Sequence, residues 1–585
     1  MTWTAGVTLV VVVVMVVALV REFVAPAVAV VAGMIALLVL GIIDADRALA
    51  GFSNPAPITV AALFVLARAV EKTGALEPFV AGAISPRGES RQGLLRILGP
   101  TAAASAVFNN TPIVAMLVPQ VSAWARRHGQ PVALFLMPIS FAAILGGMVT
   151  LIGTSTNLIV SGLLEEAGQE PLGMFEMTPV GAPVAVVGIL MLAFLAPKIL
   201  TARQGPLERF DASFREYAVE MEVQSGGPVD GVTVEDAGLR HLQGVFLVRI
   251  ARGDGLVAPV GPDEVLQGGD LLGFVGRADL VVDLQAVRGL RSAEYKHADS
   301  FRDATHNFFE AVISPISPLV GRTLADAGFR EQYGAAVLAV HRAGDRIREK
   351  LGTVELRAGD TLLLLSDQDF ERRWRDRRDF LLVADLDGAL PVGSRRGLFV
   401  LGTAAAVVTL AALGVLSVLK GALVGAVLMV ATGTLTPNEA RNALNLDVLL
   451  VIAAAFGIGA AIEDSGLAAL VAAALVMPAE VVGPMGGLAA VIVATVLLTE
   501  LITNNAAAVL MFPVAQAAAV SAGGDARAFA IAVALAASAS FLTPIGYQTN
   551  TMVYGPGGYR FIDYCRLGAP VTVMVVILIT ALLAA

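Results

Sequence analysis

Phe108-Asn109-Asn110-Thr111-Pro112 is a short polar stretch inside an apolar segment, and a second copy occurs at Thr503-Asn504-Asn505-Ala506. Each copy is followed by another polar break. The first is Thr150-Leu151-Ile152-Gly153-Thr154-Ser155-Thr156-Asn157, and the second is Thr543-Pro544-Ile545-Gly546-Tyr547-Gln548-Thr549-Asn550. These breaks begin 41 and 39 residues after the first Asn of their copies. Four polar breaks in two matched pairs are typical of a membrane transporter built from repeats.

The composition indicates a membrane protein. Of the 585 residues, 56% are hydrophobic and 15% are charged, whereas soluble domains carry about 25% charged residues. The apolar residues form two blocks, 1–200 and 396–585, and each contains several runs of the roughly 20 residues that a membrane-spanning helix needs. The net charge of −9 arises mostly from a polar insert between the blocks and does not suggest nucleic-acid binding. The single Cys565 excludes internal disulfides and cysteine metal clusters.

The apolar segment 98–123 is polar only at its centre. A continuous helix would put Asn109 and Asn110 near the middle of the bilayer, just before Pro112, which has no backbone N–H. A turn there is tolerable if it faces protein or water. We therefore predict a re-entrant hairpin with its tip at 109–111, and a second one in the matching segment 496–521.

The second type of break interrupts a helix. Gly146-Gly147 and the polar residues 150–157 divide the segment that begins at residue 132, and 526–542 leads into the break at 543–550. This is the pattern of discontinuous transmembrane helices. Further spans are predicted near 3–20, 24–43, 58–70, 179–200, 397–417, 421–435, 447–462, 485–500 and 568–585.

Residues 201–395 contain many charges and strand-length apolar runs, such as 245–250 and 361–365. They also contain an internal repeat with an offset of 90 residues. Gly231, Asp236-Ala237-Gly238, Gly244 and Gly269-Asp270 recur as Gly321, Asp326-Ala327-Gly328, Gly334 and Gly359-Asp360. The repeat predicts two tandem α+β modules, each with an early strand, a short helix around Asp-Ala-Gly, a strand, and a Gly-Asp turn before a closing strand. The predicted domains are 1–204, 205–292, 293–392 and 393–585.

The sequences 104–116 and 146–157 resemble the divalent anion/sodium symporter family, and more narrowly its bacterial and algal sulfate-permease branch. The stretch 543–550, followed by Tyr554-Gly555-Pro556-Gly557-Gly558-Tyr559, fits the same branch. The insert resembles the TrkA-C (RCK-C) module of potassium-transport regulators, which interrupts the two halves in this branch.

The resemblance implies a polytopic α-helical membrane protein with an inverted repeat, two re-entrant hairpins and broken helices. It also implies a substrate site between the hairpin tips, sodium as the coupling ion, and a homodimer that works as an elevator. We expect a multi-pass protein of the cell (inner) membrane with its insert in the cytoplasm. The family tips read Ser-Asn-Thr, and its dicarboxylate-type breaks read Thr-Pro-Pro-Asn. Because this chain departs from both, a smaller oxyanion is expected rather than succinate or citrate.

A dehydrated anion needs hydrogen-bond donors, which Asn amides, Thr hydroxyls and half-helix N-termini supply. The first candidates are Asn110, Thr111 and Asn505, beside Asn109 and Asn504 at the tips; the second choices are Thr154, Thr156 and Thr549. Sodium prefers several oxygens. One expected sodium site uses Ser105, Asn109, Asn110 and Gly153; its mirror uses Thr503, Asn505 and Gly546. Asn157 and Asn550 either join the site or cap half-helices by bonding backbone groups.

Glu500 lies four residues before Asn504, as Ser105 lies four before Asn109. A carboxylate at membrane depth is costly and usually functional. We therefore weigh two roles for Glu500, a contribution to coupling by sodium or protons and a surface carboxylate at a helix end.

The leading hypothesis is sodium-coupled symport of a small divalent, sulfate-like oxyanion across the lipid bilayer. The alternatives are a dicarboxylate symporter, an arsenite or silicate permease, a cation/proton antiporter, and a transporter-like membrane sensor. The insert either binds a small regulatory ligand or serves as a dimerisation platform. No nucleophile–base set or phosphate-binding loop suggests an enzyme, and no organic cofactor is indicated.

Overall fold

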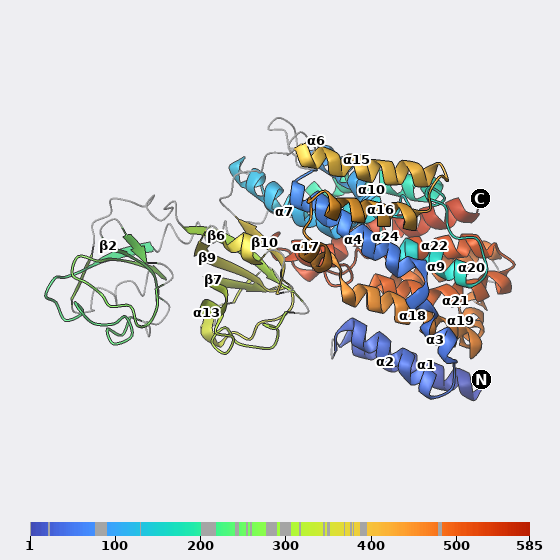
Figure 1. Cartoon of the computed structure of the whole chain (residues 1–585), viewed down its shortest axis with the longest axis horizontal. Coiled ribbons are helices and arrows are strands. Elements are labelled where there is room, and N and C mark those ends of the chain that lie inside the picture. Colours follow the sequence, from blue (N-terminus) through green and yellow to red (C-terminus); the bar gives the residue numbers. More distant parts are fainter. Residues whose placement is uncertain are drawn as a thin grey trace.

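The computed structural model describes residues 2–21, 24–75, 90–128, 130–200, 218–239, 245–252, 255–257, 260–276, 289–292, 306–314, 317–342, 345–347, 351–367, 369–374, 377, 379–385, 395–477 and 483–584. Its helices gather in one body, and two small sheets lie to one side of it (Figure 1). The second sheet, with β6, β7 and β9, lies between the helices and the first sheet, which contains β2. The three predicted domain junctions near 204, 292 and 392 adjoin or fall within stretches outside the described residues.

Each apolar block contributes one series of helices. The first series is α1 (Trp3–Val20), α2 (Pro26–Val39), α3 (Ala45–Ser53), α4 (Pro55–Thr73), α6 (Ser90–Ser105), α7 (Asn110–Arg127), η1 (Val132–Leu134), α8 (Leu136–Gly147), α9 (Ser155–Glu166) and α10 (Thr178–Ile199). The second is α15 (Arg395–Ala412), α16 (Val418–Ala431), α17 (Pro437–Ala443), α18 (Leu446–Asp464), α19 (Leu467–Val476), α20 (Pro484–Thr499), α21 (Asn504–Ala522), α22 (Ala526–Ser538), α23 (Gln548–Tyr554) and α24 (Phe561–Ala584). Within the described residues, 6 helical segments are long and apolar enough to cross a membrane.

The two series pack reciprocally. Helices α2 and α3 pack against α18, and their counterparts α16 and α17 pack against α4. Likewise α9 packs against α21 and α22, while α23 packs against α7 and α8. Helix α10 packs against its own counterpart, α24. The halves are thus two repeats that complete each other around a two-fold relation, and the predicted polytopic helical fold is confirmed.

Both hairpin tips are real breaks. Helix α6 ends at Ser105 and α7 begins at Asn110, while α20 ends at Thr499 and α21 begins at Asn504. The arms of each hairpin pack against each other and also against α8 or α22. One prediction was wrong in detail, because the span expected at 485–500 is not a separate crossing but the first arm of the second hairpin. At 16 residues, α20 rises about 24 Å, and the polar residues at the tip end it there.

The insert forms two five-stranded sheets. The strands of the first are β1 (Ala218–Val223), β2 (Val245–Arg252), β3 (Gly255–Val257), β4 (Leu271–Gly276) and β5 (Leu290–Ser292). Those of the second are β6 (His306–Ile313), β7 (Ala335–Arg342), β8 (Asp345–Arg346), β9 (Thr361–Asp367) and β10 (Phe380–Asp385), with the short helices α13 (Phe329–Tyr333) and α14 (Phe370–Trp374). The orders β3-β2-β4-β1-β5 and β10-β6-β9-β7-β8 are the same topology, and the pairing is antiparallel throughout.

The short helix predicted around Asp-Ala-Gly is absent from both described copies. Residues 236–238 and 326–328 form turns, and in the second module α13 starts only after Gly328. Gly238 and Gly328 have φ values of 71° and 53°, a left-handed conformation that ends a helix. The predicted Gly-Asp turns do precede strands, β4 and β9, but these do not close the modules, because β5 and β10 follow them in the same sheets.

Candidate functional site

The two helix breaks are closed by the same contacts. The amide nitrogen of Asn157 donates to the carbonyls of Gly147 at 3.1 Å and Thr150 at 2.8 Å. Asn550 donates in the same way, 10 and 7 residues back, to Ser540 at 3.0 Å and Thr543 at 3.2 Å. Carbonyls freed where a helix stops are thereby satisfied away from water. Both Asn side chains therefore bond backbone groups, which was one of the two roles expected for them from the sequence.

The first tip meets the second break at Asn110, which is fully buried. Its amide oxygen accepts from the Ser105 hydroxyl, and its amide nitrogen donates to the phenol oxygen of Tyr547 at 2.6 Å. The Tyr547 oxygen also lies 3.2 Å from the Thr154 hydroxyl. Because Asn110 already donates to this phenol, the Tyr547 O–H is available for Thr154.

The second tip meets the first break. The Ser155 hydroxyl donates to the amide oxygen of Asn505 at 2.7 Å, and Ser155 follows Thr154 directly. Together these contacts form a polar chain that runs from one tip to the other. It consists of Ser105, Asn110, Tyr547, Thr154, Ser155 and Asn505.

Other predicted residues lie around this polar chain. The Thr111 hydroxyl donates to Gln548 Oε1 at 3.3 Å. Two buried hydroxyls join helices of opposite repeats: Thr156 lies 2.6 Å from the Ser538 hydroxyl, and Thr549 lies 2.8 Å from that of Ser140. At the second tip, the Thr503 hydroxyl accepts from the Ala506 N–H and caps α21, whose first residue is Asn504.

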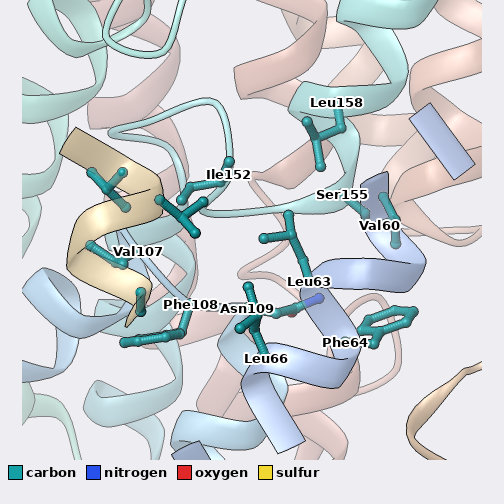
Figure 2. A pocket seen from close by; sticks show the side chains of 13 residues that line it. Val60, Leu63, Phe64, Leu66, Val107, Phe108, Asn109, Ile152, Ser155 and Leu158 are labelled. Carbon is teal, nitrogen blue, oxygen red and sulfur yellow. The ribbon is translucent and has the colours of Figure 1, made fainter. Parts of the chain in front are cut away.

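A pocket opens beside the first tip (Figure 2). Its polar lining comes from Asn109 and Ser155, and the remainder is apolar. The apolar walls belong to α4, the first tip, the start of α9, and α15. Asn109 thus faces a space bounded by both repeats, next to the Ser155 that holds Asn505.

The structure brings some of the predicted sodium-site residues into two groups, Ser105, Asn110 and Gly153 in one and Glu500 and Gly546 in the other. In the first, a Cβ at Gly147 would lie 2.7 Å from the amide oxygen of Asn110, and one at Gly153 would lie 2.6 Å from the Gly147 carbonyl. Asn110, with its partner Ser105, is therefore close to the loop that carries Gly153. In the second group, a Cβ at Gly546 would lie 3.0 Å from the Glu500 carboxylate. Such backbone and side-chain oxygens are suitable ligands for a hard cation.

Glu500 holds the second break through hydrogen bonds. Its carboxylate accepts from the N–H groups of Phe541 and Leu542, both at 2.7 Å, and from the Thr543 hydroxyl at 2.8 Å. The residue stands at the C-terminal end of α20 and is half-buried. It is thus tied to the loop beside the polar chain.

Sequence reasoning did not select Tyr547, Ser155, Ser140 or Ser538 as site residues. Tyr547 stands where the first repeat has Thr154, and this mismatch between matched breaks was the available signal. The two serines on α8 and α22 carried no signal, because a single hydroxyl in an apolar helix is most often bonded to its own backbone.

Comparison with known proteins places the chain among transporters. A sequence model of the citrate transporter family (CitMHS) matches residues 10–536. A Chlamydomonas reinhardtii protein whose name refers to regulation of the sulfur deprivation response is 38% identical over 558 residues, covering 91% of this chain and 93% of that protein. An uncharacterized transporter of Synechocystis sp. is 36% identical over 558 residues, covering 92% and 90%. Sodium/sulfate cotransporter 1 of C. reinhardtii is 26% identical over 749 residues, covering 92% and 84%.

Among solved structures, the RCK domain of GsuK is similar to part of this chain. The match covers 33% of this chain and 78% of the GsuK domain, with 10% sequence identity and a TM-score of 0.15. A similarity of this size carries no argument about the insert.

Proposed function

The chain belongs to the citrate transporter (CitMHS) family and is a membrane transporter, not an enzyme; from that premise we propose that it carries a small divalent, sulfate-like oxyanion together with sodium. The single observation behind the proposal is the polar chain between the two tips. Its amide and hydroxyl groups come from both repeats and lie where two broken helices and two hairpins converge.

The chemistry of the polar chain favours coupling to a cation. All six of its residues are neutral, so an anion bound there would lose its water without gaining a positive partner. Burying such a charge is costly unless it is paired. Sodium ions on neighbouring oxygens would supply that charge. Relatives named sodium/sulfate cotransporters support coupling to sodium.

We assign the anion to the groups nearest the tips, Asn109, Asn110, Thr111, Thr154, Asn504 and Asn505. Thr156 and Thr549 form a second layer, since both are fully buried and each bonds a serine on α22 or α8 that lies outside the polar chain. The sodium ligands we assign are Ser105, Asn109, Asn110 and Gly153 on one side, and Glu500, Thr503, Asn505 and Gly546 on the other.

A small anion is favoured by Tyr547. Tyr547 is 6% exposed and stands at the sequence position that matches Thr154 in the other repeat. Because a phenol ring is larger than a threonine side chain, we expect it to disfavour a longer dicarboxylate or citrate between the tips. The remaining features follow the same proposal: an elevator-type motion, a homodimer, and a multi-pass protein of the inner membrane with its insert in the cytoplasm.

Radiolabelled sulfate uptake into proteoliposomes tests the proposal. We expect accumulation under an inward sodium gradient, little without it, and weak competition by citrate or succinate. Arsenate serves as a second oxyanion competitor. Uptake of citrate in preference to sulfate would reverse the substrate assignment, and uptake driven equally by a proton gradient would reverse the sodium assignment.

A sensor is the second candidate, because one relative is named for regulating a response to sulfur deprivation. A protein of that kind would bind sulfate without accumulating it. Equilibrium binding measured beside uptake separates the two, since a transporter accumulates the anion under a gradient and a sensor does not.

A further inference from the structure

The outer face of the second sheet in the insert is buried. Val312 on β6, Thr361 on β9 and His341 on β7 are cross-strand neighbours on this face. They are 0%, 1% and 3% exposed. Their neighbours along the strands, such as Leu362 and Ile313, point the other way into the core of the module itself. Something outside the module must therefore cover this face.

The helical body covers it. Val312 belongs to the large apolar cluster of the helices and not to the core of its own module. Any Cβ added at Gly555, in the turn after α23, would overlap the Thr361 side chain, and one at Gly359 would lie 3.6 Å from Thr551 on α23. Strand β10 packs against α7, and its Leu381 packs against the same helical cluster.

The covered face thus contacts the helices of the candidate site. Helix α7 begins with Asn110 and Thr111, and α23 begins with Gln548 and Thr549. These four residues make the contacts between the first tip and the second break or stand beside them. The second module therefore contacts α7, which follows the first tip, and α23, which follows the second break.

The first module has the same fold but a different outer face. At the matching positions it has Glu222, Leu271 and Ala251, which pair across the strands as Val312, Thr361 and His341 do. Leu271 is 36% exposed, where Thr361 is buried. The first module lies beyond the second from the helices (Figure 1), and the two touch where the Arg330 guanidinium donates to the Val260 carbonyl.

We propose that the outer face of the second sheet is the coupling surface of the insert, which holds α7 and α23 in their positions at the site. Within the described residues, the first module contacts the second through Arg330 and Val260, which gives it a route to the site through the second module. The tight fit of Gly555 against Thr361 is the central contact, because neither side can gain an atom without moving the other.

Hydrogen exchange of the purified full-length protein tests the coupling surface with a matched pair of variants. Thr361→Arg places a charged side chain in the buried face, and Leu271→Arg places the same side chain at the equivalent exposed position. We expect the amides of 548–558 to exchange at least about tenfold faster in Thr361→Arg, with those of 504–522 unchanged. Leu271→Arg should leave both segments unchanged. Unaltered exchange of 548–558 in Thr361→Arg would overturn the proposal.

A suppressor pair makes the test independent of general destabilisation. Gly555→Ala should also speed exchange of 548–558, because its methyl group overlaps Thr361. Adding Thr361→Gly to Gly555→Ala should restore slow exchange to within about twofold of the unmodified protein. If the double variant exchanges as fast as Gly555→Ala alone, the contact does not hold the turn and the proposal fails. Neither readout needs a transported anion, so its failure is distinguishable from failure of the proposed function.

Discussion

The two repeats share their scaffold and differ in their site chemistry. Asn157 and Asn550 close their breaks through carbonyls at the same spacing. An ion pair between repeats is kept as well, with its charges exchanged: Arg47 on α3 pairs with Asp464, and Glu439 on α17 pairs with Lys72. Arg47 and Glu439 are 392 residues apart, as are Lys72 and Asp464.

At the site itself the matched residues differ. Ser105 corresponds to Glu500, Thr154 to Tyr547, and Gly147 to Ser540. The scaffold must be alike because each repeat packs against the other. Under the proposed function the site residues are free to differ, because one anion between the tips would meet each tip only once. The two repeats have therefore kept the same packing of helices, while the residues at the candidate site have diverged.

Removing the centre of the polar chain should have the largest effect. Asn110→Ala deletes both amide groups and leaves the Ser105 hydroxyl and the Tyr547 phenol without this partner. A buried polar group left unpaired costs about 1–3 kcal/mol. We expect sodium-driven uptake to fall by at least about a hundredfold. Thr101→Val is the control, since Thr101 lies in the same hairpin and bonds only its own helix; equal losses in both variants would contradict a specific role for Asn110.

The two break-closing asparagines should both be needed for stability, but not equally. Asn157→Ala and Asn550→Ala each remove two hydrogen bonds to backbone carbonyls, at a cost of about 2 kcal/mol or more. Asn550→Ala also removes the hydrogen bond that its amide oxygen accepts from the Ser140 hydroxyl at 2.7 Å. We expect the melting temperature of the purified protein to fall in both variants, and further in Asn550→Ala. A fall confined to one of them would mean that only one break depends on its asparagine.

The sequence predicted the breaks well and their partners poorly. Polar residues in the middle of an apolar run have few tolerable arrangements, so the tips at Asn110 and Asn505 could be located from the pattern alone. The bond from Asn110 to Tyr547 joins residues 437 positions apart, and it depends on how the repeats pack. The short helices α3 and α19 lacked the length that marks a span, and Gly238 and Gly328 ended the helix expected around Asp-Ala-Gly.

Glu500→Gln tests the difference between Glu500 and Ser105. An amide has one acceptor oxygen, so it cannot accept from Phe541, Leu542 and Thr543 as the carboxylate does. We expect uptake to fall about tenfold and to need more sodium for half-maximal rate. Uptake measured against sodium and pH gradients checks this. Unchanged dependence on both gradients would remove Glu500 from coupling and leave it a brace for the second break.

Tyr547→Phe tests the difference between Tyr547 and Thr154, and its expected effect on transport is smaller than that of Glu500→Gln. The ring stays, but Asn110 and Thr154 lose the phenol between them, a loss of about 1 kcal/mol for one hydrogen bond. We expect a several-fold rise in the KM for sulfate. Tyr547→Thr copies the first repeat and removes the ring, so it should strengthen competition by succinate; if succinate competes no better, the ring does not limit anion size.

The exchanged ion pairs should give the smallest effect. Arg47→Glu places an acid beside Glu463 and Asp464 and should destabilise the protein slightly. Adding Asp464→Lys recreates the polarity of the other repeat and should recover most of the loss. The pairs are partly exposed, with side chains of Lys72 and Glu439 at 36% and 29%, so each is worth less than about 1 kcal/mol. A double variant less stable than Arg47→Glu alone would mean that the two pairs are not equivalent.

The pH dependence of the second pair sharpens the same comparison. The Lys72 ammonium, hydrogen-bonded to Glu439, lowers the pKa of that carboxyl from 4.5 to about 2. A lowered acid pKa means that the pair stabilises the fold above pH 4.5, and that this contribution disappears as the pH falls toward 2. Glu439→Gln should therefore lower the melting temperature a little at pH 6 and progressively less below pH 4.5. A difference from the unmodified protein that grows on acidification would show that Glu439 is not stabilised as an anion by Lys72.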